Sequence, residues 1–83
     1  MRSRKLLIKL LAGHLQNVRF GDFKELLEDF GFRLSRVSGS HHIYTHEGIS
    51  DIINIQNVKG QAKPYQIRQA LKLIELHNLR LEE

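Results

Sequence analysis

Three of the five histidines in this 83-residue chain lie within six residues, in the segment SGSHHIYTH at positions 38–46. Histidine changes its charge near neutral pH, so its imidazole can accept or donate a proton during a reaction. Gly39 and Ser40 directly precede His41 and His42. Glycine allows a backbone to approach a bound group closely. The segment is therefore a candidate site for proton transfer.

A metal site is the other chemistry that clustered histidines suggest. His41, His42 and His46 would be the ligands of a zinc ion. Adjacent residues of a strand point to opposite faces, however, and no cysteine or carboxylate completes a set of four ligands. We therefore expect no metal and no other cofactor. The complete lack of cysteine excludes disulfides and fits a cytoplasmic location.

The length and the charge limit the possible classes of protein. A chain of 83 residues has room for one domain with one core, so a surface site is more plausible than a deep pocket. The net charge is +4, and the excess of basic residues falls in 1–36 and 59–83. Such basic flanks make a nucleic acid a reasonable partner. The apolar run KLLIKLLA at 5–12 is shorter than a membrane span and contains Lys9, so no membrane partner is expected.

Two helices are predicted before the histidine segment. Leucines spaced three and four residues apart indicate an amphipathic helix over 3–12. A second helix is predicted over 22–30, where Asp22 and Glu25 have the spacing of a capping box. Gly31 then has the residue type that ends a helix in the left-handed conformation.

The centre of the chain changes to a strand pattern. Three short segments rich in β-branched and aromatic residues are separated by glycines, and they read FRLSRV, HHIYTH and DIINIQN. Short connections favour hairpins, so a three-stranded antiparallel sheet is expected. Pro64 can occupy the first turn of a last helix that extends to about His77.

The elements therefore follow the order α, α, β, β, β, α in an α+β protein. The helices at 22–30 and 64–77 would cover one face of the sheet and leave the other open. Without its first helix, this order is the one found in double-stranded-RNA-binding domains. We expect a single domain over 1–83, with a helical extension at 1–20 and a core at 22–79.

The segment GSHHIY, together with FKELLEDFGFRLSRVS before it, resembles the HicA family of toxins from bacterial toxin–antitoxin pairs. The resemblance implies a double-stranded-RNA-binding-like fold and an endoribonuclease (mRNA interferase) activity that cleaves mRNA without a metal. It also implies a HicB-type antitoxin as partner, in a toxin–antitoxin hetero-oligomer. The family's catalytic histidine corresponds to His41 by position, with His42 as the second candidate.

Cleavage of RNA needs a base for the 2′-hydroxyl, donors for the phosphate oxygens and an acid for the leaving oxygen. A histidine can supply the base. Backbone groups, a hydroxyl and ammonium groups would bind phosphate, and an exposed aromatic ring would stack on a nucleobase. The candidate RNA-binding residues are Gly39, Ser40, Tyr44, Lys59 and Lys63.

The sequence leaves open which face of the middle strand is covered. In a regular strand, His41 shares a face with Ile43, and His42 shares the other face with Tyr44 and His46. Ile43 favours the first face as the core side, which would place Tyr44 outside, and a buried Tyr44 would reverse this. Two further functions also remain: a non-catalytic RNA-binding module, and a protein-interaction domain whose apolar first helix docks a partner.

Overall fold

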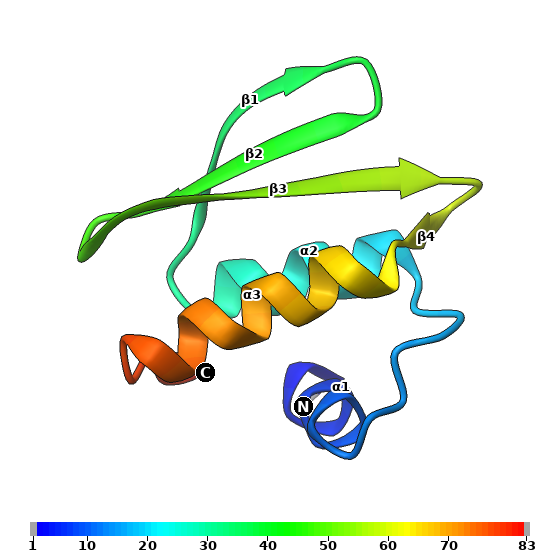
Figure 1. Ribbon diagram of the computed structural model, residues 1–83, viewed down its shortest axis with the longest axis horizontal. Helices are drawn as coiled ribbons and strands as arrows, with labels where there is room; N and C mark the ends of the chain where they lie inside the picture. Colours follow the sequence, from blue (N-terminus) through cyan, green and yellow to red (C-terminus); the bar gives the residue numbers. More distant parts are fainter. Residues whose placement is uncertain (1, 83) are drawn as a thin grey trace.

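The computed structural model describes residues 2–82, and Figure 1 shows their arrangement. These residues form three helices and a four-stranded antiparallel sheet, an α+β architecture. The strands are adjacent in chain order, β1-β2-β3-β4. The elements are α1 (Arg2–Leu11), α2 (Phe20–Asp29), β1 (Arg33–Ser38), β2 (His41–His46), β3 (Ile49–Val58), β4 (Gln61–Ala62) and α3 (Pro64–Leu76).

The molecule is built in layers. Helices α2 and α3 lie along one face of the sheet, and α1 packs on α2 on the side away from the sheet (Figure 1). The other sheet face has no helix over it among the described residues, as the element order predicted. Apolar side chains from every layer meet in one core, whose largest fully buried members are Tyr44, Phe23, Phe32, Leu26, Leu27, Ile55 and Ile67.

The expected count of three strands is wrong, because a short fourth strand, β4, pairs with the end of β3. The turn between them contains Lys59 and Gly60, whose φ angles are 52° and 83°. Asn57 stabilises this turn by accepting the Gly60 N–H at 2.8 Å through its side-chain oxygen. With only two residues, β4 is too short to show the alternation that reveals a strand in a sequence.

Helix α2 begins at Phe20, two residues before the predicted start. Its N-cap is Arg19, which makes no side-chain capping bond, so Asp22 is not the capping residue. Instead, Asp22 and Glu25 face α1, where Arg2 lies 2.9 Å from Glu25 and 3.9 Å from Asp22. The capping-box spacing therefore reflects a tertiary ion pair and not the start of the helix.

The end of α2 confirms the prediction for Gly31. This residue has φ 93°, and its N–H donates to the Glu28 carbonyl at 3.0 Å. The Phe32 N–H donates to the Leu27 carbonyl at 3.0 Å, which completes a Schellman motif. Phe32 is consequently directed into the core, where it is 2% exposed.

The covered face of β2 is the one that carries Tyr44. Tyr44 is fully buried and lies opposite Ile53 of β3, which is 4% exposed. The assignment that Ile43 favoured is therefore wrong: Ile43 is on the open face and is only partly buried, by its strand neighbours. This arrangement directs His41 toward the open face and His42 toward the helices.

The bounds expected for the whole domain, 1–83, and for the extension, 1–20, include Met1 and Glu83, which lie outside the described residues. Within 2–82, α1 packs on α2 and contributes Leu10 to the core. Ser3 of α1 also donates a hydrogen bond from its hydroxyl to Asp29 of α2. None of the helices in this part of the chain has the length and apolar character needed to cross a bilayer.

Candidate active site on the open face of the sheet

The turn before β2 sets the position of both candidate histidines. Ser38 pairs with His41 across the hairpin, so Gly39 and Ser40 form a two-residue loop. Gly39 adopts φ 61°, the conformation that a glycine takes at little cost in such a turn. A Cβ added at Gly39 would have no atom of residues 2–82 within 4 Å, so the outside of the turn is open to the rest of the described chain.

His41 is exposed at the start of β2 and has a hydrogen-bond partner on β3. Its Nδ1 lies 3.2 Å from Oδ1 of Asn54. An amide oxygen only accepts hydrogen bonds, so Nδ1 must carry the proton when this bond forms. In the neutral ring, Nε2 then holds the free lone pair. The arrangement thus presents a proton acceptor on the open face.

The register between β2 and β3 brings these two residues together. His41 pairs with Gln56, and Ile43 pairs with Asn54, so Asn54 lies diagonally across from His41 on the same face. Neither Asn54 nor Gln56 was predicted from the sequence to be a site residue. The alternation in DIINIQN was an available signal, because it places both polar side chains opposite to the buried Ile53 and Ile55.

His42 lies on the helix side of the sheet, and its ring packs edge-on against Phe20 with 4.7 Å between ring centroids. Its Nδ1 lies 3.3 Å from the Ser40 carbonyl oxygen, which makes Nδ1 the donor. The ring also lines a small cavity of about 470 Å³ that includes Arg19 and Lys24. His41 and His42 point to opposite faces, so they do not form an acid–base pair.

The two candidate lysines occupy different places. Lys59 is exposed in the turn between β3 and β4. Lys63 precedes α3, with its Nζ 3.5 Å from Oε1 of Gln56 and 5.4 Å from the centre of the Tyr65 ring. Gln56 is the strand partner of His41. Lys63 therefore contacts a direct neighbour of the candidate base.

Tyr44 does not have the position that base stacking requires. Its side chain is 0% exposed, so no nucleobase can reach the ring in this conformation. Burial, with a smaller contribution from the Glu28 carboxylate, raises the pKa of Tyr44 from 10.0 to about 12. Its hydroxyl has no hydrogen-bond partner among the described residues. Tyr44 is therefore a core residue, and its buried position does not fit the expected stacking on a nucleobase.

The third histidine of the segment is separate from His41. His46 packs edge-on against Phe32 with 5.0 Å between ring centroids, and its Nδ1 accepts the Gly48 N–H at 3.0 Å. His46 shares the helix side of β2 with His42, whereas His41 faces the other way. Within residues 2–82, no three histidine or carboxylate side chains are grouped so that they could hold a metal ion.

The site thus belongs to a small α+β protein with an exposed histidine beside a glycine–serine turn. A model of the family described as "HicA toxin of bacterial toxin-antitoxin" matches residues 20–76, which is more than half of the chain. The chain therefore belongs to the HicA family of toxins. Comparisons with curated proteins and with solved structures gave no significant match.

Proposed function

We propose that this HicA family protein is an endoribonuclease that cleaves mRNA, with His41 as the general base. The observation that carries the proposal is the contact between His41 Nδ1 and Asn54 Oδ1 at 3.2 Å, on the open face of the sheet. When Nδ1 donates to this oxygen, Nε2 of the neutral ring keeps its lone pair, and the ring is exposed, so a ribose can approach it.

In the proposed step, Nε2 of His41 removes the proton from a ribose 2′-hydroxyl. The 2′-oxygen then forms a bond to the adjacent phosphorus, and the bond from phosphorus to the 5′-oxygen breaks. The leaving 5′-oxygen takes up a proton, so the products are a 2′,3′-cyclic phosphate and a free 5′-hydroxyl. This reaction needs no metal, and a histidine base contributes about 10²–10⁴-fold to such a step. We assign to His41 the base role alone.

Groups around His41 are suited to binding the RNA backbone. The Gly39 and Ser40 backbone and the Ser40 hydroxyl lie at the turn before it, and Lys63 lies beside its strand partner Gln56. Arg36 is exposed on β1 opposite Ile43, which is on the same face as His41. We propose that these groups bind phosphate oxygens near the scissile bond. Lys59 would contact phosphate further along the RNA.

The element order supports a double-stranded-RNA-binding-like fold for the core. Helix α2, strands β1 to β3 and helix α3 follow the α-β-β-β-α order of such domains, with the two-residue strand β4 added between β3 and α3. We propose residues 22–79 as the nuclease core, to which the helix within 1–20 is added. Residues 1–83 would then form one domain that acts in the cytoplasm.

Membership of a toxin family implies an antitoxin partner. We propose a HicB-type protein that forms a hetero-oligomer with this chain and inhibits it by covering the open face around His41. Covering this face would keep RNA away from the proposed base, which is exposed there.

His42 is the second candidate base because it lines a cavity that also contains two basic residues. We place it second because its ring is partly buried against Phe20. Its Nδ1 bond to Ser40 also ties the ring to its own hairpin. We propose that His42 mainly holds the turn in place.

The test is incubation of the purified protein with an mRNA fragment in EDTA, followed by analysis of the ends. Products with 2′,3′-cyclic phosphate and 5′-hydroxyl ends support the proposal. RNA that is retained in a salt-sensitive manner but stays intact would contradict it and favour a non-catalytic RNA-binding module.

A further inference from the structure

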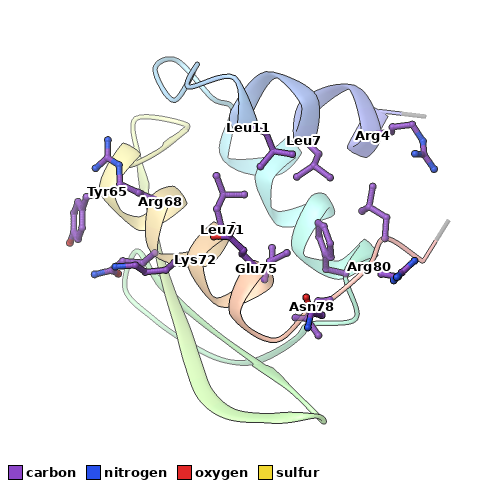
Figure 2. Close-up of a pocket in the computed structure, with 15 residues that line it drawn as sticks. Arg4, Leu7, Leu11, Tyr65, Arg68, Leu71, Lys72, Glu75, Asn78 and Arg80 are labelled. Atoms are coloured by element: carbon purple, nitrogen blue, oxygen red, sulfur yellow. The ribbon is translucent and has the colours of Figure 1, made fainter.

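A wide groove lies on the helix side of the molecule, between α1, α3 and the segment that follows α3. Its volume is about 1260 Å³. Figure 2 shows α1 on one side and α3 on another, with side chains from both directed into the space between them. In the described part of the chain, its lining residues come from α1, α3, Phe30 and 78–81, and none comes from the sheet, so an occupant would leave His41 uncovered.

The floor of the groove is apolar. It is lined by leucines from α1 and α3 and from the chain after α3, among them Leu7, Leu11, Leu71 and Leu81. Leu11 is 69% exposed, and Tyr65 at the other end is 49% exposed. Leu7, Leu71 and Leu81 are partly buried, so they still present apolar surface to the groove. An apolar groove with exposed side chains at its ends is typical of a surface that another protein covers.

The rim of the groove is basic. Among residues 2–82, its charged lining residues are Arg4, Arg68, Lys72 and Arg80, against one acidic residue, Glu75. Arg68 and Lys72 are four residues apart on α3, so they lie on the same side of this helix, and both are exposed. A partner that fits must therefore combine apolar residues for the floor with acidic residues for the rim.

Part of the groove lies outside the residues that define the family match. Its α1 wall and its residues 78–81 are not within 20–76. The surface is thus not explained by the proposed nuclease site, which is built from β2 and β3.

We propose that this groove docks an acidic amphipathic helix of a protein partner. A helix with apolar residues three and four positions apart would place them on the leucine floor. Glutamate or aspartate residues at its sides would meet Arg68 and Lys72. RNA fits less well, because its phosphates would leave the leucine floor uncovered. A second copy of this chain also fits less well, since its acidic helix α2 is already packed against α1 and the sheet.

The test uses the full chain and a fluorescent synthetic peptide of about 16 residues, a length that permits a stable helix. The peptide carries leucine at every third or fourth position and glutamate between them, and a reference peptide has lysine in place of glutamate. Fluorescence anisotropy should show saturable binding of the glutamate peptide and at least ~10-fold weaker binding of the lysine peptide. Equal binding of the two, or no binding of either, overturns the proposal.

Two matched pairs of variants locate the binding site. The double variant R68E/K72E should weaken binding by about 10-fold, and K5E/K9E should leave it unchanged. Both pairs reverse two exposed charges four residues apart on a helix, but Lys5 and Lys9 do not line the groove. A second pair of variants tests the apolar floor of the groove: Leu11→Ser should weaken binding and Ile8→Ser should not. Both side chains are well exposed on α1, so neither change threatens folding, and Ile8 is outside the groove.

Further experiments test whether RNA or a second copy of this chain occupies the groove instead. A short single-stranded RNA should not displace the peptide, and amide NMR shifts caused by the peptide should map to α1, α3 and 78–81. Displacement of the peptide by RNA would show that RNA binds the same surface, and NMR shifts confined to β2 and β3 would place the peptide on the sheet. Either result overturns the proposal. Sedimentation that shows a dimer of the chain alone, abolished by R68E/K72E, would also overturn it in favour of a second copy.

Discussion

Nδ1 of His41 lies 3.2 Å from the side-chain oxygen of Asn54, across the boundary between β2 and β3. When Nδ1 donates in this contact, it carries the proton of the neutral ring, and Nε2 keeps the lone pair that the proposed base needs. Asn54 is accordingly a positioning residue in the proposed mechanism, because it acts on RNA only through His41.

Changing Asn54 to Asp should shift the pH dependence of cleavage. A carboxylate at this place favours the protonated imidazole, and a protonated ring cannot act as a base. The rise of kcat/KM with pH should therefore occur at higher pH in N54D than in the wild type. The measurement is cleavage of a short RNA as a function of pH.

Asn57→Asp is the control for this shift, since it adds the same charge to β3 but its side chain binds the Gly60 N–H in the turn to β4. Its pH profile should coincide with that of the wild type. Identical shifts in N54D and N57D would mean that the contact between Asn54 and His41 has no role in the reaction.

Replacing Tyr44 with Phe should stabilise the protein or leave its stability unchanged, because it removes a buried hydroxyl that has no partner among residues 2–82. An unsatisfied buried group of this kind costs about 1–3 kcal/mol. The free energy of unfolding, measured with urea, should rise by up to about 1 kcal/mol, and the rate of RNA cleavage should not change. A loss of RNA binding at unchanged stability would restore the stacking role of Tyr44.

Tyr44→Phe should also lose less of its free energy of unfolding in strong alkali than the wild type does. Folding raises the pKa of Tyr44 to about 12, so the stabilising effect of the neutral phenol is complete below pH 10. It is lost as the pH rises from about 10 to about 12. Over this range the wild type should lose more stability than Tyr44→Phe, and parallel losses would contradict the assignment.

Gly31→Ala should destabilise the protein by about 1–2 kcal/mol because of its positive φ. The residue has φ 93°, and an added Cβ would lie 3.1 Å from Nε2 of His46 and 3.3 Å from Oε2 of Glu82. Gly21→Ala is the matched control. It lies in the first turn of α2 with no atom within 4 Å of the new Cβ, and it should stabilise the helix by up to about 1 kcal/mol. Equal effects of the two changes in thermal unfolding would contradict the role given to the Gly31 backbone.

The local elements of this fold were predictable where the sequence carries its own boundary signals. The strand over 41–46 was predicted with its observed limits, because glycines flank it on both sides. The end of α2 was predicted from Gly31, and the start of α3 from Pro64. In each case the signal lies in residues next to the boundary.

The features that were missed depend on residues far apart in the chain. Asp22 has the spacing of an N-cap residue in the sequence, but its carboxylate pairs with Arg2 of another helix. The alternation of β2 shows two faces without showing which one the helices cover, and the burial of Tyr44 decides this. The contact of His41 with Asn54 depends on the register of β2 and β3, which the sequence leaves undetermined. The groove between α1 and α3 likewise follows from tertiary packing alone.

The measurement that tests the central claim most directly is the single-turnover rate of RNA cleavage in EDTA by the wild type, His41→Ala and His42→Ala. His41 is exposed, so its loss should leave the unfolding curve unchanged while the rate falls by about 10²–10⁴-fold. The rate of His42→Ala should fall far less, in proportion to any loss of stability. Undiminished cleavage by folded His41→Ala would remove this histidine from the mechanism, and loss of cleavage in His42→Ala alone would place the base on the opposite side of the sheet.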